Sequence, residues 1–101
     1  MKVIYIAGAY RNSTEWGLIE NIRHAEREAI KLWQHGWAVL CPHKNTAHFG
    51  GTCPDKVWLE GDLEMLSRCD AIYMLTDWDL SEGALQEYEK AKELNLEIYY
   101  E

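Results

Sequence analysis

Apolar residues along the chain alternate between short continuous runs and longer stretches in which they recur every three or four positions. Continuous β-branched runs predict buried strands, and a spacing of three and four predicts helices with one apolar face. The expected strands are about residues 3–7, 37–41, 70–75 and 97–100. The expected helices are about residues 15–35, 55–67 and 83–94. The apolar face of the first helix is expected to comprise Leu18, Ile22, Ala25, Ala29, Leu32 and Trp33.

Alternating strands and helices predict a single α/β domain over residues 1–101. We expect a minimal doubly wound, Rossmann-like or flavodoxin-like fold, with a four-stranded parallel sheet in the order 2-1-3-4 and three helices. Ligands in such folds bind beyond the carboxyl ends of the strands, near the point where strand order reverses. Three predicted loops emerge there, at residues 8–12, 41–54 and 76–83. The middle loop exceeds the usual length of about 2–6 residues, which is typical of a binding loop or lid.

Glu87 interrupts the apolar face of the last predicted helix. Ala84, Glu87, Ala91 and Leu94 are spaced three, four and three apart, so Glu87 is expected to face the sheet. An ionised carboxylate is costly to bury unless a partner or a function compensates. One interpretation is an active-site nucleophile or base. The alternative is a glutamate at the edge of the core that pairs with a local Lys or Tyr.

Asp62 repeats this anomaly on the preceding helix. Trp58, Asp62, Met65 and Cys69 are spaced four, three and four apart, and Asp62 is the one acid among them. Two inward acids on consecutive helices favour a catalytic pair whose environments separate their pKa values. The alternative is that one acid bonds the backbone near the other, or that Asp62 caps a loop.

The start of the last predicted helix has the chemistry of an anion site. Ser81 is suited to cap this helix, whose free N–H groups and dipole favour an anion, and Gly83 lets a ligand approach the backbone. Gly8 permits a tight turn after the first strand. Arg11 is the only cation in that loop and can hold a phosphate or carboxylate with two hydrogen bonds. The alternative for Arg11 is a surface pair with one of the 17 acidic residues.

Composition excludes several classes of function. The formal charge of −7 argues against nucleic acid polymers and anionic membranes as partners, but not against a small anionic ligand. No apolar run approaches about 18 residues, and no signal-peptide pattern opens the chain. Three cysteines without a C-x-x-C pair favour reduced thiols and a cytoplasmic location.

The histidines and cysteines of the middle loop do not have the spacing of a standard zinc motif. They are Cys41, His43, His48 and Cys53. We therefore expect no metal and no other cofactor. His43, Asn45 and Phe49 are expected instead to line a pocket for a heterocyclic base, and the alternative is that they have only structural roles in the loop.

Five Trp and six Tyr are many for this length. A domain of this size leaves some rings exposed unless they line a ligand pocket or a subunit interface. Trp16, Trp58 and Trp78 lie at element edges and are the candidates for such positions. We expect a homodimer or a larger homo-oligomer.

Three motifs, in their order and spacing, resemble those of the nucleoside 2-deoxyribosyltransferase-like superfamily. They are Y-I-A-G-A-Y-R at residues 5–11, G-D-L at 61–63 and S-E-G-A-L-Q-E at 81–87. The resemblance covers nearly the whole chain. The segments C-P-H-K-N-T at 41–46 and G-D-L-E at 61–64 are similar to those of a small branch common among phage and prophage proteins.

The resemblance implies cleavage of the N-glycosidic bond of a 2-deoxynucleoside or its 5′-monophosphate, by hydrolysis or base exchange and without a metal. It implies Glu87 as the nucleophile, Asp62 near the base or as proton donor, and Tyr5 as the residue that orients Glu87 or the sugar. Positions that hold a 5′-phosphate in relatives correspond to Arg11, Ser81 and Gly83. The expected substrate-binding residues are, in full, Gly8, Tyr10, Arg11, His43, Asn45, Asp79, Ser81 and Gly83.

Departures from the family pattern leave alternatives open. Ala9 stands where relatives often carry Ser or Pro, and the chain lacks a fifth strand and the C-terminal tail that completes the site in relatives. A non-catalytic nucleotide-sensing module on the same fold is one alternative, and a flavin-binding redox domain is another. The two inward acids favour an enzyme, because a binding module has no need of them.

Overall fold

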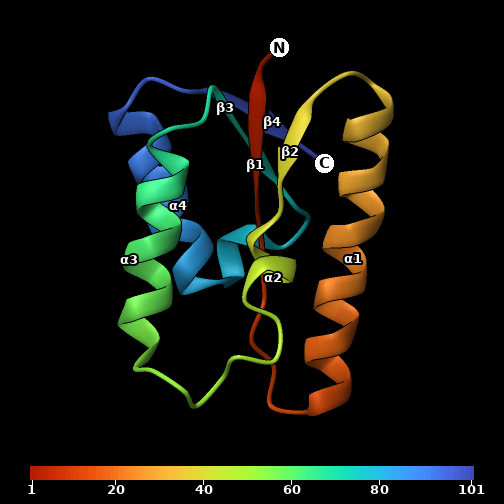
Figure 1. Ribbon diagram of the computed structural model, residues 1–101, viewed down its shortest axis with the longest axis vertical. Coiled ribbons are helices and arrows are strands. Elements are labelled where there is room, and N and C mark those ends of the chain that lie inside the picture. The colour runs from red at the N-terminus through yellow and green to blue at the C-terminus, as the bar shows by residue number, and fades with distance from the viewer.

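A four-stranded parallel sheet with helices on both faces forms the molecule, and the computed structural model describes all residues from Met1 to Glu101 (Figure 1). The strands are β1 (Val3–Ala7), β2 (Ala38–Leu40), β3 (Ala71–Met74) and β4 (Glu97–Tyr100). The helices are α1 (Glu15–Gln34), α2 (Pro42–Asn45), α3 (Asp55–Leu66) and α4 (Glu82–Glu93), with a 3₁₀ turn η1 at Trp78–Leu80. The order β2-β1-β3-β4 confirms the predicted doubly wound α/β sheet.

The loop predicted over residues 41–54 contains a helix that the apolar pattern did not predict. This helix, α2, is four residues long, which is too short to show a helical period. Pro42 occupies its first turn, where a fixed φ suits the helix and the missing N–H is not needed. The expected three helices are therefore confirmed as α1, α3 and α4, and α2 is a fourth.

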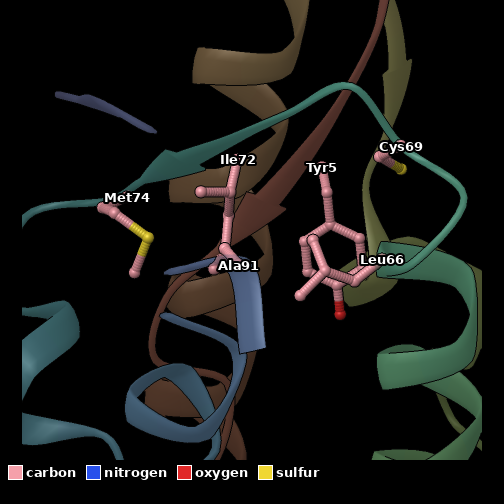
Figure 2. Close-up of a cluster of buried hydrophobic side chains, with 7 residues drawn as sticks. Tyr5, Leu66, Cys69, Ile72, Met74 and Ala91 are labelled. Atoms are coloured by element: carbon pink, nitrogen blue, oxygen red, sulfur yellow. The ribbon is translucent and has the colours of Figure 1, made fainter. Parts of the chain in front are cut away.

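Side chains alternate across the central strands and pack into two separate cores. Tyr5 and Ala7 face α3 and α4, where they meet buried residues of β3 and both helices. Figure 2 shows the Tyr5 ring among Leu66, Ile72 and Ala91 on this side of the sheet. On the other side Ile6 packs with Leu75 and with two alanines of α1, which alone among the long helices covers that face in Figure 1.

Trp33 was predicted to belong to the apolar face of α1, and this prediction is wrong. Its side chain is 55% exposed, whereas Ala25 and Ala29 are buried. Successive residues point about 100° apart around a helix. Since Leu32 packs against the core, Trp33 points beyond the arc that the sheet covers.

The ends of the helices place the loops at one edge of the sheet. Thr14 caps α1 by accepting a hydrogen bond from the N–H of Gly17, and Gly36 follows the helix with a φ of 93° that suits glycine. All strand pairs are parallel, so the loops after β1, β2 and β3 share the carboxyl edge. None of the helices is long and apolar enough to span a membrane.

Candidate active site

Glu87 lies on the buried side of α4, as its spacing predicted. α4 turns Ala84, Glu87 and Ala91 toward the sheet, and the Glu87 side chain keeps only 8% of its surface exposed. The hydroxyl of Tyr5, a fully buried residue of β1, donates a hydrogen bond to Oε2 of Glu87. A strand and a helix that both pack in the core therefore fix the position of this carboxyl.

The surroundings of Glu87 favour its neutral form when the site is empty. Burial raises the pKa of Glu87 to about 8, the hydrogen bond from Tyr5 lowers it in part, and the nearby Asp62 carboxylate raises it further. No Lys, Arg or His forms an ion pair with this glutamate. The pKa of Tyr5 is raised far above its usual value by burial and then by Glu87, so Tyr5 stays a neutral donor.

Asp62 is the second acid of the site. It lies half-buried on α3, and burial raises its pKa to about 6. Its charge raises the pKa values of both Glu87 and Tyr5, which shows that the three groups lie within electrostatic range. Two interacting carboxyls titrate as a pair, and this pair carries one proton between about pH 6 and pH 8.

A third inward acid, Glu28 on α1, was not predicted. It is buried on the opposite face of the sheet and accepts a hydrogen bond from Tyr73 at 2.8 Å. Lys31 pairs with it at 2.7 Å, so its charge is compensated, unlike that of Glu87. The signal was present in the sequence, because Ala25, Glu28 and Leu32 are spaced three and four apart. Its ion pair marks Glu28 as a structural acid.

His43 holds the loop that follows β1. The residue is buried, and burial lowers its pKa, so the ring is neutral and Nε2 donates to the carbonyl of Ala9 at 3.0 Å. The ring of Tyr10 meets it edge-on, with centroids 5.9 Å apart. The Nδ1 atom of His43 is buried without a hydrogen-bond partner. Contact of His43 with a substrate base stays a prediction, as does that of Asn45, which is exposed at the end of α2.

The residues predicted to form an anion site, Ser81 and Gly83, lie at the start of α4, and their binding of an anion stays a prediction. The Ser81 side chain caps the helix by accepting from the N–H of Ala84 at 3.3 Å, which confirms the predicted cap. A Cβ atom built on Gly83 meets no atom within 4 Å, so open space adjoins the backbone there. Asp79 is exposed in η1, one turn ahead of the helix.

Gly8 and Arg11 have partners within the chain. A Cβ at Gly8 would lie 2.6 Å from the Leu75 side chain, so the glycine makes room for core packing. The Arg11 guanidinium pairs with Asp55, the first residue of α3, at 2.7 Å, and both side chains are exposed. This is the surface pair that the sequence left open for Arg11. Its role in holding a phosphate stays a prediction.

Two of the three tryptophans considered for a pocket or interface pack within the chain. Trp58 contacts Phe49 with ring centroids 6.0 Å apart, and Trp78 contacts Tyr88 at 4.4 Å. Trp16 is largely exposed on α1. The structure contains no cluster of three or more His, Cys, Asp or Glu side chains that could hold a metal ion.

Comparison with known proteins identifies a family and a fold. The family described as Domain of unknown function (DUF4406) matches residues 2–100. No curated protein sequence matches the chain. Among solved structures the chain is similar to a 2-deoxyribosyltransferase from Bacillus psychrosaccharolyticus, with a TM-score of 0.67 and 20% identity over 97% of this chain and 70% of that one.

A second similar structure is a 2-deoxyribosyltransferase from Leishmania mexicana, with a TM-score of 0.69 and 19% identity. The match covers 99% of this chain but 63% of the Leishmania protein, which is less than two thirds of its length. At these identities the similarity shows a shared fold, and it supports the 2-deoxyribosyltransferase-like fold that the motifs indicated. The phage-type branch and the cytoplasmic location stay predictions.

Proposed function

The chain belongs to the family described as Domain of unknown function (DUF4406), and we propose that it is an enzyme that cleaves the N-glycosidic bond of a 2-deoxynucleoside or its 5′-monophosphate. The observation that carries this proposal is the buried Glu87 carboxyl, which has a neutral donor in Tyr5, a second acid in Asp62 and no cation. Two solved structures that share the fold are those of 2-deoxyribosyltransferases, which supports nucleosides as the class of substrate.

In the first step the ionised Glu87 attacks the anomeric carbon of the deoxyribose. The bond from that carbon to the base nitrogen breaks, and its electron pair stays on the base. Protonated Asp62 gives its proton to the leaving base. The products are a free base, an ionised Asp62 and a deoxyribosyl ester on Glu87.

In the second step a water molecule or a second base attacks the same carbon and releases Glu87 as a carboxylate. Asp62 takes the proton from the attacking group and so returns to its starting form. Water as acceptor gives hydrolysis, and a base as acceptor gives transfer. Tyr5 donates to Glu87 throughout, which holds the attacking oxygen in position and keeps the carboxylate from turning away.

The active form of the pair has Glu87 ionised and Asp62 protonated. In the empty site the proton favours Glu87, because its pKa of about 8 exceeds the value of about 6 for Asp62. A substrate sugar that becomes cationic as the glycosidic bond weakens stabilises the Glu87 carboxylate. The positive charge on the sugar therefore stabilises the Glu87 carboxylate in the transition state more than in the empty site. A catalyst needs this difference, because only interactions that are stronger in the transition state accelerate the reaction.

A non-catalytic nucleotide-binding module on the same fold is the alternative. A binding module needs cations to hold the phosphate, and the cation predicted for that role, Arg11, is already paired with Asp55. Such a module gains nothing from two inward carboxyls that are costly to ionise, because burial raises the pKa of both and the Asp62 charge raises that of Glu87 further. The pairing of Glu87 with Asp62 therefore favours the enzyme.

Incubation with a panel of 2′-deoxynucleosides, ribonucleosides and their 5′-monophosphates, followed by chromatography for free base, tests the proposal. We expect release of base from at least one deoxy substrate. Addition of a second base distinguishes transfer from hydrolysis. Binding of a nucleotide by calorimetry without any release of base would instead support the sensing module.

A further inference from the structure

The outward side of α1 carries apolar side chains at the spacing of a coiled-coil seam. α1 runs along the length of the molecule (Figure 1). Four of its large apolar residues are exposed to solvent: Trp16 (68%), Ile19 (38%), Ile30 (56%) and Trp33 (55%). The positions that alternate three and four apart are Trp16, Ile19, Arg23, Glu26, Ile30 and Trp33. This is the repeat by which two helices pack on each other. Its four apolar side chains are exposed, whereas Glu26 keeps only 17% of its side-chain surface exposed and pairs with Lys44 of α2.

The seam matches itself when the helix is turned end to end. An antiparallel second copy sets Trp16 against the partner's Trp33 and Ile19 against the partner's Ile30. It also sets Arg23 against the partner's Glu26, so opposite charges meet at the centre. We propose that α1 is a dimerisation surface, on which a second copy of this chain packs its own α1 antiparallel about a two-fold axis. This inference does not depend on the proposed reaction.

Charge along the seam supports a second copy as the occupant. Arg23 is exposed and pairs with Glu26 of its own helix at 2.7 Å, and Glu26 also pairs with Lys44. Glu20 and Arg27 lie beside the seam. In the antiparallel arrangement Glu20 of one copy lies near Arg27 of the other. These glutamates and arginines on α1 sum to no net charge, whereas the whole chain carries −7. Two acidic chains can therefore approach through α1 without the repulsion that other faces would produce.

A hollow on α1 has the shape that this packing requires. It has a volume of about 400 Å³ and is lined by Trp16, Ile19, Glu20, Arg23 and Arg27. The first four of these residues stand at positions i, i+3, i+4 and i+7, the set that forms the hole for an inserted side chain in coiled coils. In the antiparallel register the partner's Ile30 faces this hollow. The two-fold axis repeats the contact, so the dimer has two such insertions.

The expected dimer is small and concentration-dependent. A helix of 20 residues is about 30 Å long, and a single helix pair lies at the low end of stable interfaces, which cover about 800 Å² per partner. We therefore expect dissociation in the micromolar range. Sedimentation velocity of the wild type from about 1 to 200 μM should show conversion of an 11.8 kDa monomer to a dimer.

Charge reversal at the centre of the seam tests the register. Arg23→Glu places like charges together at two points and should raise the dissociation constant by about 100-fold or more. The triple variant Arg23→Glu, Glu26→Arg and Lys44→Glu restores opposite charges both across the seam and between positions 26 and 44 of one protomer, and it should dimerise within tenfold of the wild type. The matched control is Arg68→Glu on α3, because Arg68 also pairs with a glutamate of its own helix, at 3.1 Å. Circular dichroism confirms that each variant is folded.

Cysteine cross-linking gives a second, independent readout of direction. In a Cys53→Ser background, which removes the exposed native thiol, we expect a mixture of Ile19→Cys and Ile30→Cys proteins to form disulfide-linked dimers that neither protein forms alone. Cross-linking of each variant with itself would show a parallel or different arrangement and overturn the proposal. A wild type that stays monomeric at 200 μM, or a dimer that is unaffected by Arg23→Glu, would overturn it as well.

Discussion

The hydroxyl of Tyr5 donates a hydrogen bond to the carboxyl of Glu87, and so links β1 to α4 across 82 positions of the chain. Both side chains are buried, and no cation accompanies them. A buried acid in a stable core normally has a compensating charge, as Glu28 has in Lys31. Glu87 instead keeps a raised pKa of about 8, which a merely structural role does not require.

The pH–rate profile of base release should be bell-shaped. The active pair carries one proton, so kcat/KM falls below the lower apparent pKa, near 6, and above the upper one, near 8. Asp62→Asn removes the proton donor, and it also removes the charge that raises the pKa of Glu87. We expect a rate loss of about 10²–10⁴-fold, no alkaline limb, and a rise with pH governed by a pKa below 8. A bell that is unchanged in Asp62→Asn would contradict the assignment.

The free energy of unfolding should report the ionisation of Glu87 without any substrate. The folded pKa of about 8 lies above the ordinary value of 4.5, so the unfolded chain releases this proton first. Glu87 therefore stabilises the protein fully below about pH 4.5, and this contribution is lost as pH rises through 8. Urea denaturation at pH 5, 7 and 9 measures this loss. Between pH 5 and pH 9 the free energy of unfolding of wild type should fall by several kcal/mol relative to that of Glu87→Gln, because each unit of pKa shift corresponds to ~1.4 kcal/mol. A difference between the two proteins that is constant with pH would show that the glutamate is not buried as described.

Variants of the Arg11–Asp55 pair should separate phosphate binding from surface pairing. If Arg11 holds a 5′-phosphate, Arg11→Ala lowers kcat/KM for the monophosphate by about tenfold or more and leaves the nucleoside unchanged. Asp55→Ala frees the guanidinium and should shift preference toward the monophosphate. Because the pair is exposed, neither change should unfold the protein. If the ratio of kcat/KM for the monophosphate to that for the nucleoside is the same in wild type and both variants, Arg11 serves only in a surface ion pair.

Gly83→Ala should increase stability while it weakens substrate binding. A Cβ at Gly83 meets no atom within 4 Å, and alanine is favoured over glycine by about 1 kcal/mol in a helix interior, so a gain below that value is expected at Gly83, the second residue of α4. A ligand that approaches the backbone at the start of α4 would meet this methyl group, so KM should rise about tenfold or more. Gly61→Ala on α3 is the matched control, since a Cβ there also has open space. A lower KM, or the same change of KM in both variants, would argue against substrate at Gly83.

The apolar pattern predicted the strands and the three long helices, because these depend on periodicities that local sequence contains. The sheet order followed from the general topology of doubly wound α/β folds, the class that the alternation of strands and helices indicated. It also predicted the inward positions of Glu87 and Asp62, each as a polar residue in an apolar stripe. It did not predict α2, which is too short to show a period. The partner of Arg11 lies 44 positions away, and only the folded course of the two loops brings it close.

Glu28 shows a further limit of the pattern. Its spacing in α1 resembles that of Glu87 in α4, and sequence alone does not reveal that Lys31 neutralises one acid while no cation reaches the other. The exposed seam of α1 was hidden for a related reason. Trp33 was predicted in the core face and Trp16 at a pocket or interface, and only the structure shows that both lie on the arc of α1 that the sheet leaves exposed.

The role of Glu87 as the nucleophile can be measured by the release of free base from the best deoxy substrate at pH 7, with wild type, Glu87→Gln and Glu28→Gln proteins. Both variants exchange a buried carboxyl for an amide of the same shape, but only Glu87 is expected to attack the sugar. We expect a loss of about 10³-fold or more in Glu87→Gln and activity within tenfold of wild type in Glu28→Gln. Activity of Glu87→Gln within tenfold of wild type, or equal losses in the two variants, would contradict this role.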